Sequence, residues 1–375
     1  MAVAAGRLAL GRDGDPDADA AVVRRVVLVT RDPALLDGGS AAVLLAGLGL
    51  GLDTACVELL GGAPATLDAL AAAGPDTLVI AADLDPAGSA AALVGEGDTP
   101  SVLRVSRSLP VLTRSTDGVV RDYGDERLMR ERGLGVSLEW MGLQDRPVAV
   151  AGLAAKQAGA LCAAPPPKLP TTGASSTLFA VAAMAEQRLT GLLLAVEQAT
   201  ASAVWLDVDA EVRRREPPAR PRPTTQATPG PEIPISLPAY ERAFEPKLRW
   251  EAGRCTACDT LAFPPRYRCL ECGCEQPSTP VSLPRAGSVY TCTTVHVPVP
   301  GMATPYSLAI VELDGVGVRA LVQVTDAGGP EPVGIGDRGE LVFRRVAVRT
   351  GVPDYGYAFA ATGTDTANAS EEDGR

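Results

Sequence analysis

The sequence predicts two different domains, an α/β domain at the N-terminus and a small β domain with a four-cysteine metal site at the C-terminus. Three observations lead to this prediction. Apolar strand-like runs alternate with helical segments over residues 22–210, and a Pro-rich, Arg-rich stretch follows them. Two Cys-x-x-Cys pairs then precede a series of short strand-like runs that are separated by turns.

The α/β domain is expected to span residues 1–212. Its strand-like runs are apolar along their whole length, which is typical of parallel strands covered by helices on both faces, so we expect a mainly parallel sheet. Residues 95–145 are less regular and rich in Arg, Asp and Glu. The expected strands are 22–30, 54–60, 77–82, 147–151, 190–196 and 203–208, and the expected helices are 40–49, 63–73, 154–164 and 175–188.

A linker and a tail flank the second domain. Residues 213–238 are rich in Pro and Arg and nearly free of large apolar residues, which predicts an extended linker. Its arginines are expected to be solvated, and the alternative is a docking strap for an acidic surface. The polar residues 363–375 are expected to be disordered.

Charge and hydropathy restrict the possible partners and the compartment. The chain of 375 residues has a formal net charge of −11, which opposes binding to nucleic acid or to an anionic membrane. No apolar run is long enough for a spanning helix, and the acidic N-terminal segment lacks the pattern of a secretory signal. We therefore expect a cytoplasmic protein.

Four of the eight cysteines form two pairs, Cys255 with Cys258 and Cys269 with Cys272. In a cytoplasmic chain this spacing indicates a metal site before it indicates disulfides. Four thiolates complete a tetrahedron around Zn²⁺ and leave no open position, so the predicted site is structural. Iron is the rival ion, unligated reduced cysteines are the alternative to a metal, and Cys274 is a possible substitute ligand.

The second domain is divided into a lead segment with the cysteine pairs, residues 239–284, and a small barrel, residues 285–362. Short strand-like runs of this number and spacing favour a five-stranded barrel. The expected barrel strands are 287–297, 306–314, 318–325, 339–346 and 356–361.

Several motif pieces occur in order between about Leu248 and Ala361. They resemble the zinc-ribbon/OB-fold subunits that accompany thiolase-like enzymes in acyl-CoA chemistry, including scaffold subunits of archaeal hydroxymethylglutaryl-CoA synthase complexes, diacetylphloroglucinol acetyltransferase and steroid side-chain aldolases. The resemblance implies a rubredoxin-like zinc ribbon, a five-stranded OB-fold barrel, a structural Zn²⁺ and acyl-CoA as a shared substrate. The pieces are Gly253-Arg254-Cys255, Phe263-Pro264-Pro265-Arg266, Gly287-Ser-Val-Tyr, Thr294-Val295-His296, Ile335-Gly336-Asp337 and Tyr357-Ala-Phe359.

The first domain, over about residues 8–210, then resembles a truncated and degenerate thiolase-like domain of the hydroxymethylglutaryl-CoA synthase or ketoacyl synthase III type. The segment 57–63 resembles the strand, turn and helix that carry the family's nucleophilic cysteine. Residues 78–95 resemble the strand that follows with its sequel, and residues 170–176 resemble a Gly-Asn-Thr-Gly-Ala-type turn.

The groups that thioester condensation requires are missing from this pattern. The nucleophile position falls on Gly61 or Gly62, Thr171 takes the Asn position, and residues 151–155 lack the usual histidine. The single histidine of the chain, His296, lies in the other domain and is expected to be a surface or barrel residue. We therefore assign no catalytic residue, and the cofactor-binding residues are unknown.

The leading hypothesis is a non-catalytic accessory subunit that pairs, in a hetero-oligomer, with a thiolase or ketoacyl synthase-like catalytic subunit and helps to bind the CoA thioester. One alternative is a self-sufficient acyltransferase that uses Cys56, with Cys162 a weaker candidate. Another is a nucleic-acid-binding zinc-ribbon/OB protein. The remaining cysteine, Cys292, is expected in the barrel core. The carboxylates of Glu58, Asp83 and Asp85 are expected to lie in loops and caps.

Overall fold

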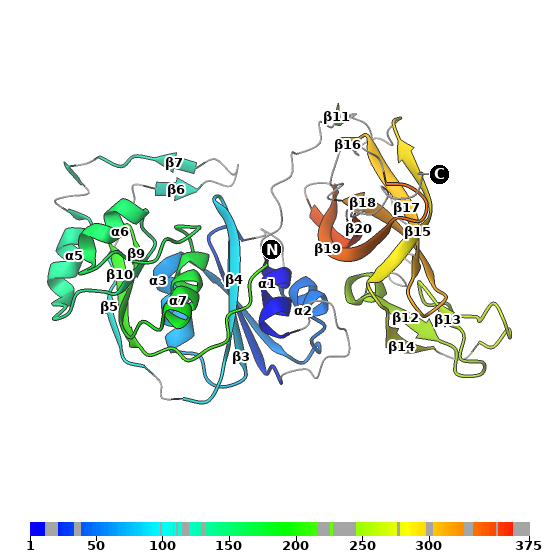
Figure 1. Cartoon of the computed structure of the whole chain (residues 1–375), viewed down its shortest axis with the longest axis horizontal. Helices are drawn as coiled ribbons and strands as arrows, with labels where there is room; N and C mark the ends of the chain where they lie inside the picture. The colour runs from blue at the N-terminus through cyan, green and yellow to red at the C-terminus, as the bar shows by residue number, and fades with distance from the viewer. Residues whose placement is uncertain are drawn as a thin grey trace, which may run out of the picture. The chain divides into compact units, whose positions relative to one another are not determined.

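The computed structural model of the chain is shown in Figure 1. It separates into two compact units, which consist mainly of residues 1–215 and residues 216–375. No helix among the described residues is long and apolar enough to cross a membrane. The structure describes residues 1–11, 22–33, 39–97, 100–107, 109, 112–114, 120–125, 127–128, 132–215, 226–227, 245–275, 278–297, 303–325, 333–349 and 352–362.

The first unit contains two four-stranded sheets, and both are mixed. Strand β1 pairs in parallel with β2 and β3, and β8 pairs in parallel with β9, while the other pairs are antiparallel. The expectation of a mainly parallel sheet was therefore wrong. The turns after β3 and β9 are too short for a helical crossover. The next strand, β4 or β10, therefore pairs antiparallel with the strand before it. In spatial order, one sheet comprises β2 (Ala55–Leu60), β1 (Arg25–Thr30), β3 (Thr77–Leu84) and β4 (Ala87–Val94), and the other comprises β5 (Val102–Val105), β10 (Thr200–Leu206), β9 (Gly191–Glu197) and β8 (Ala149–Ala151).

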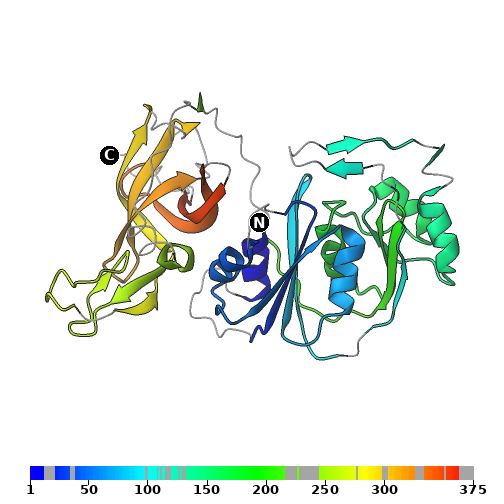
Figure 2. The same cartoon turned by 180° about the vertical axis from the view of Figure 1, so that it is seen from behind.

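Two helices, α3 (Ala63–Ala71) and α7 (Ser175–Gln187), lie between these sheets and contact strands of both (Figures 1 and 2). On the outer sides, α1 (Ala2–Ala9) packs on β3 and β4, and α5 (Leu134–Met141) packs on β5 and β10. The remaining elements of the unit are α2 (Ala41–Leu48), α6 (Ala155–Leu161), which contacts β8, and a hairpin of β6 (Leu112–Arg114) and β7 (Val120–Asp122).

Strand β9 shows why the sequence of this unit is so apolar. Leu193 belongs to the core that includes Leu67 of α3 and Met184 of α7. Its neighbour Leu194 belongs to the core on the opposite face, with Ala158 of α6. Because successive side chains of a strand point to opposite faces, a strand that is covered on both faces has no position left for a polar residue.

The N-terminus of α7 receives a carboxylate from the neighbouring sheet. Asp83 of β3 is only 2% exposed, and its oxygens accept hydrogen bonds from the backbone N–H of Ala174 at 2.8 Å and of Ser175 at 2.9 Å. A Cβ atom at Gly173 would overlap this carboxylate, so the residue must be glycine. Asp83 was expected in a loop or a cap; it lies in strand β3 and caps the N-terminus of α7, where the helix dipole favours an anion.

The N-terminus of α3 is satisfied in the same way from the other sheet. Glu197, the last residue of β9, accepts a hydrogen bond from the backbone N–H of Gly62 through Oε2 at 3.0 Å. The hydroxyl of Thr177, in the first turn of α7, donates to the carbonyl of Ala63 at 2.8 Å. Each central helix thus begins at a carboxylate from one of the two sheets. Asp83 of β3 accepts at α7, and Glu197 of β9 accepts at α3.

After the short strand β11 (Gln226–Ala227), the described part of the second unit continues with a helical turn at residues 245–249. A three-stranded sheet follows and precedes a closed five-stranded barrel. The five predicted barrel strands are confirmed. The small sheet has the order β13 (Leu261–Ala262), β12 (Glu251–Arg254) and β14 (Thr279–Ser282). The barrel comprises β15 (Ala286–Val295), β17 (Tyr306–Leu313), β18 (Arg319–Thr325), β20 (Val352–Ala361) and β19 (Arg338–Arg349), and β11 (Gln226–Ala227) pairs with β16 (Ala303–Thr304).

Trp250 joins the small sheet to the barrel. It is 3% exposed, and its ring lies 4.7 Å from the ring of Phe263 and 5.0 Å from the ring of Tyr357. Its indole N–H donates to the carbonyl of Pro284 at 3.0 Å, which satisfies the one polar atom of the buried side chain. The small sheet and the barrel therefore share one apolar core.

Most of the predicted linker and all of the predicted tail lie outside the described residues. Within the linker, the structure describes residues 213–215 and the short strand β11. Both expectations for these segments stay predictions.

Replacement of Asp83 by alanine should destabilise the first unit, because buried N–H groups of α7 would lose their acceptor. We expect a loss of about 2 kcal/mol, which lowers the midpoint of its thermal transition by roughly 4–8 °C. Calorimetry of the full chain measures the shift. Asp145→Ala, at an exposed carboxylate of the same unit, is the control and should leave the midpoint unchanged; an equal midpoint for both variants would refute the role of Asp83.

Candidate metal centre

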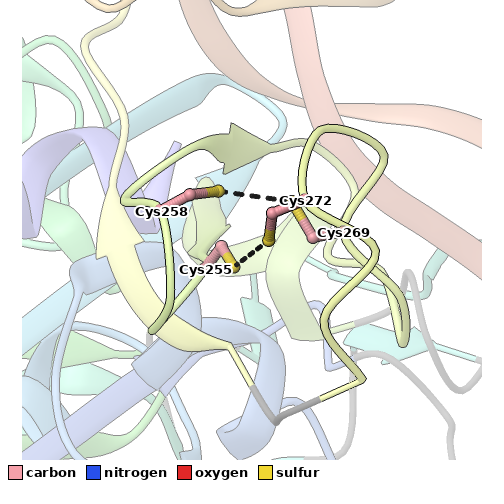
Figure 3. Close-up of side chains that lie close together, drawn as sticks. All are labelled: Cys255, Cys258, Cys269 and Cys272. Atoms are coloured by element: carbon pink, nitrogen blue, oxygen red, sulfur yellow. Dashed lines mark hydrogen bonds between the residues drawn. The ribbon is translucent and has the colours of Figure 1, made fainter.

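The four cysteines of the predicted site lie together in the second unit (Figure 3). Their sulfur atoms are all within 4.8 Å of one another. The Sγ atoms of Cys255 and Cys272 are 3.7 Å apart, and those of Cys258 and Cys269 are 3.6 Å apart. Four sulfurs at about 2.3 Å from a tetrahedral Zn²⁺ are separated by about 3.8 Å, and a disulfide would require about 2.05 Å. The spacing therefore fits a metal ion and not a pair of disulfides.

Both cysteine pairs are held by the same backbone turn. The residue after the second cysteine donates its N–H to the carbonyl of the first cysteine, and it has a left-handed backbone, with φ of 59° at Asp259 and 72° at Gly273. The first cysteine donates its own N–H to the carbonyl of the second residue after the pair. The distances are 3.0 Å from Asp259 to Cys255, 3.1 Å from Gly273 to Cys269, 2.9 Å from Cys255 to Thr260, and 2.9 Å from Cys269 to Cys274.

The electrostatics of the cluster favour a cation. Contacts with the side chain and backbone of Thr260 lower the pKa of Cys258 to about 6. At Cys272 the backbone of Cys274 acts to lower the pKa, but the neighbouring thiols and desolvation raise it to about 12. Negative charge on one sulfur opposes ionisation of the next, so four thiolates at this spacing need a positive ion among them. The cluster could hold a metal ion and is compatible with zinc.

The two remaining cysteines of this unit lie elsewhere. Cys274 follows the second pair and is outside the group of four sulfurs. Cys292 packs against the barrel core, as expected, and its Sγ lies 3.0 Å from the carbonyl oxygen of Val333. Because the cluster already has four sulfur ligands, the geometry gives no role to Cys274 as a substitute.

In the first unit, an ion pair occupies the position where the resemblance places a nucleophile. A Cβ atom at Gly62 would lie 2.6 Å from Oε1 of Glu197 and 2.7 Å from Nε of Arg31. The same two atoms form an ion pair of 2.7 Å, and the Arg31 side chain also donates to the carbonyl of Thr172 at 3.1 Å. At Gly61, a Cβ atom would lie 2.5 Å from Cβ of Ala65. A cysteine at Gly62 would therefore have to displace the Arg31 and Glu197 side chains, and one at Gly61 would press against Ala65. Sequence reasoning missed Arg31 and Glu197, because nothing in the chain order joins residues so far apart.

The cysteines of the first unit are poor nucleophiles. Cys56 is half-buried in β2, and burial, with the negative charge of Glu58, raises its pKa to about 11. Cys162 is buried in the core beside α6, and burial raises its pKa while the charge of Arg146 lowers it in part. Both thiols stay protonated near neutral pH, and the thiolate is the reactive form.

The other residues considered from the sequence have ordinary surroundings. His296 is exposed directly after β15, and Asp85 is exposed at the turn after β3. Glu58 accepts a hydrogen bond from the backbone N–H of Ser40. Thr171 is buried, and its hydroxyl forms a hydrogen bond of 2.8 Å with the hydroxyl of Ser175.

Among solved structures, the chain is similar to the Ltp2-ChsH2(DUF35) aldolase, with 27% identity and a TM-score of 0.27 over 35% of this chain and 98% of the other. It is also similar to 3-oxoacyl-(acyl carrier protein) synthase III of Pseudomonas aeruginosa PAO1, with 19% identity and a TM-score of 0.42 over 56% of this chain and 84% of the other.

Two sequence comparisons concern the family of the chain. Residues 280–344 match the family model of the ChsH2 C-terminal OB-fold domain, which agrees with the closed barrel and with the predicted OB fold. A DUF35 domain-containing scaffold protein of Methanocaldococcus jannaschii is 39% identical over 110 residues, which cover 28% of this chain and 77% of the relative. The chain therefore belongs to the family of DUF35 domain-containing scaffold proteins.

Proposed function

We propose that this protein is a non-catalytic accessory subunit of a thiolase-type acyl-CoA complex. One observation carries the proposal: the Arg31–Glu197 ion pair occupies the space beside Gly62 that a nucleophilic side chain would need. The family of scaffold proteins to which the chain belongs supports an accessory role. A catalytic partner would transfer the acyl group or make or break the carbon–carbon bond, while this chain would help to bind the CoA thioester.

The alternative hypothesis, a self-sufficient acyltransferase, is less well supported. It requires Cys56, whose raised pKa of about 11 keeps the sulfur protonated, and it requires a general base. The one histidine of the chain is the exposed His296 of the second unit.

An edge of the first unit supports pairing with a partner of similar fold. Strand β2 is the outermost strand of its sheet and, among the described residues, pairs only with β1. Its sequence, ACVELL, contains neither Pro nor Lys, the residues that commonly protect an edge. Leu60 is 74% exposed and Leu52, just before the strand, is 69% exposed. We propose that a catalytic thiolase or ketoacyl synthase-like subunit pairs along this edge.

We further propose that the ion in the four-cysteine cluster is a structural Zn²⁺. Four thiolates without an open position suit Zn²⁺, which has no preference for another geometry here. With all positions filled by protein, the ion would hold the two turns together and would not contact substrate.

The direct test of the function is purification from the organism that makes the protein. A tagged chain should bring with it a thiolase-type protein with intact cysteine and histidines, and acyl-CoA turnover should require both chains. Cys56→Ala should leave that turnover unchanged. If the tagged chain purifies alone and turns over acyl-CoA, the proposal is wrong.

The state of Cys56 can be measured separately by alkylation with iodoacetamide and peptide mass spectrometry. Because its pKa is raised to about 11, the thiolate fraction is small at pH 7 and grows about tenfold per pH unit up to that value. The alkylation rate should follow this rise. A rate at Cys56 that has already reached its plateau at pH 8 would contradict the assigned environment.

Replacement of Leu60 by lysine should weaken pairing with the catalytic subunit about tenfold or more, because a charge would enter the proposed strand interface. Sedimentation of the mixed proteins measures the complex. Leu103→Lys is the matched control, since Leu103 is 49% exposed on β5, the edge strand of the other sheet. Equal complex formation by both variants would remove β2 from the interface.

Zinc content tests the metal assignment. The purified chain should contain about one zinc per molecule, and Cys269→Ser should lose it, because three thiolates bind more weakly than four. Cys274→Ser is the control that should retain it. Iron in place of zinc, or loss of the metal from both variants alike, would show that the assignment is incorrect.

A further inference from the structure

The segment that joins the two cysteine pairs exposes side chains that proteins usually bury. Tyr267 is 75% exposed and Leu270 is 74% exposed, and Arg266 and Arg268 beside them are exposed as well. No hydrogen bond, ion pair or ring contact engages the side chains of Arg266 and Tyr267 within the described part of the chain. We call residues 266–270 the ribbon loop.

Both ends of the ribbon loop are fixed. Before it, the ring of Phe263 packs on the buried Trp250, and Pro265 lies so close to β12 that a Cβ atom at Gly253 would be 3.1 Å from Cβ of Pro265. At its other end, Cys269 belongs to the sulfur cluster. A short loop that is held in this way loses little conformational entropy on binding, which favours recognition by it.

One of the two arginines lies close to another part of the chain. The Arg268 guanidinium lies beside the second cysteine turn, with Nη2 3.5 Å from the position of a Cβ atom at Gly273. A divalent ion with four thiolates would carry negative charge, and a guanidinium beside this turn would offset it. Within the described part of the chain, nothing explains why Arg266, Tyr267 and Leu270 are exposed. Tyr and Arg are among the residues that contribute most to binding at protein interfaces.

The geometry points to the ribbon loop as a docking site for a protein surface with an apolar pocket and acidic residues around it. Leu270 and the Tyr267 ring would fill the pocket, and Arg266 would pair with a carboxylate. A protein fits better than a nucleic acid, because a net charge of −11 repels a polyanion and Leu270 offers nothing to a phosphate backbone. The metal cluster would then serve recognition as well as folding.

This inference rests on the proposed function, which supplies the catalytic subunit as the protein that would dock on the ribbon loop. The first test uses the complex isolated with the tagged full chain. A photocrosslinking residue, p-benzoylphenylalanine, replaces Tyr267 in one variant and Tyr290, a 50% exposed barrel residue, in another. Position 267 should crosslink to the catalytic subunit. Crosslinking of position 267 to nucleic acid or to a second copy of this chain would overturn the inference.

The second test measures affinity for the purified catalytic subunit. Leu270→Ala and Arg266→Glu should each weaken binding about tenfold or more, and Arg266→Glu should also reduce its salt dependence. Leu321→Ala, at a 67% exposed leucine of β18, is the matched control and should bind normally. All variants should retain their metal, which separates lost contact from lost folding.

The outcomes distinguish the two proposals. If the complex forms but the ribbon-loop variants bind as tightly as the unaltered chain, the docking site is wrong and the accessory function stands. If no catalytic subunit accompanies the chain at all, the proposed function fails first, and the docking site fails with it.

Discussion

The first unit depends on one constraint, the need to satisfy the N-termini of two helices that are buried between two sheets. Water cannot reach these N–H groups, so protein acceptors must replace it. Each of the two sheets supplies a carboxylate that accepts these hydrogen bonds. Asp83, from the sheet of β3, caps α7, and Glu197, from the sheet of β9, caps α3. Both carboxylates interact favourably with the positive end of a helix dipole, and together they fix the helices relative to both sheets.

This constraint has a consequence for function. The start of α3 is where the thiolase-like resemblance places a nucleophile, and the same space is filled here by Glu197 and its partner Arg31. The backbone N–H of Gly62 donates to Glu197, so this donor is not available to a developing oxyanion or a thiolate. The ion pair and a nucleophilic side chain would therefore compete for one position, which supports the proposed accessory role. The family of scaffold proteins to which the chain belongs agrees with this proposal.

Much of this arrangement could be predicted from local sequence. The spacing of Cys255 to Cys272 was sufficient to predict a sulfur cluster, and the barrel strands followed from their alternation. Strand β4, with the sequence AGSAAALV, has a single β-branched residue, Val94, and was not among the expected strands, because small residues do not mark a strand. The Arg31–Glu197 pair could not be predicted, because it joins the residue after β1 to the last residue of β9, in two sheets that only tertiary packing brings together.

We propose that the chemistry occurs on another chain. The most direct test of this proposal is to mix the assembled complex with a slow acyl-CoA substrate, quench it with acid, and determine the intact mass of each subunit. Transfer of the acyl group from the CoA sulfur to a cysteine, with release of CoA, adds the acyl mass to one chain. The account predicts this mass on the catalytic partner and an unmodified mass for this protein. An acyl adduct on this chain, at Cys56 or at any other residue, would contradict it.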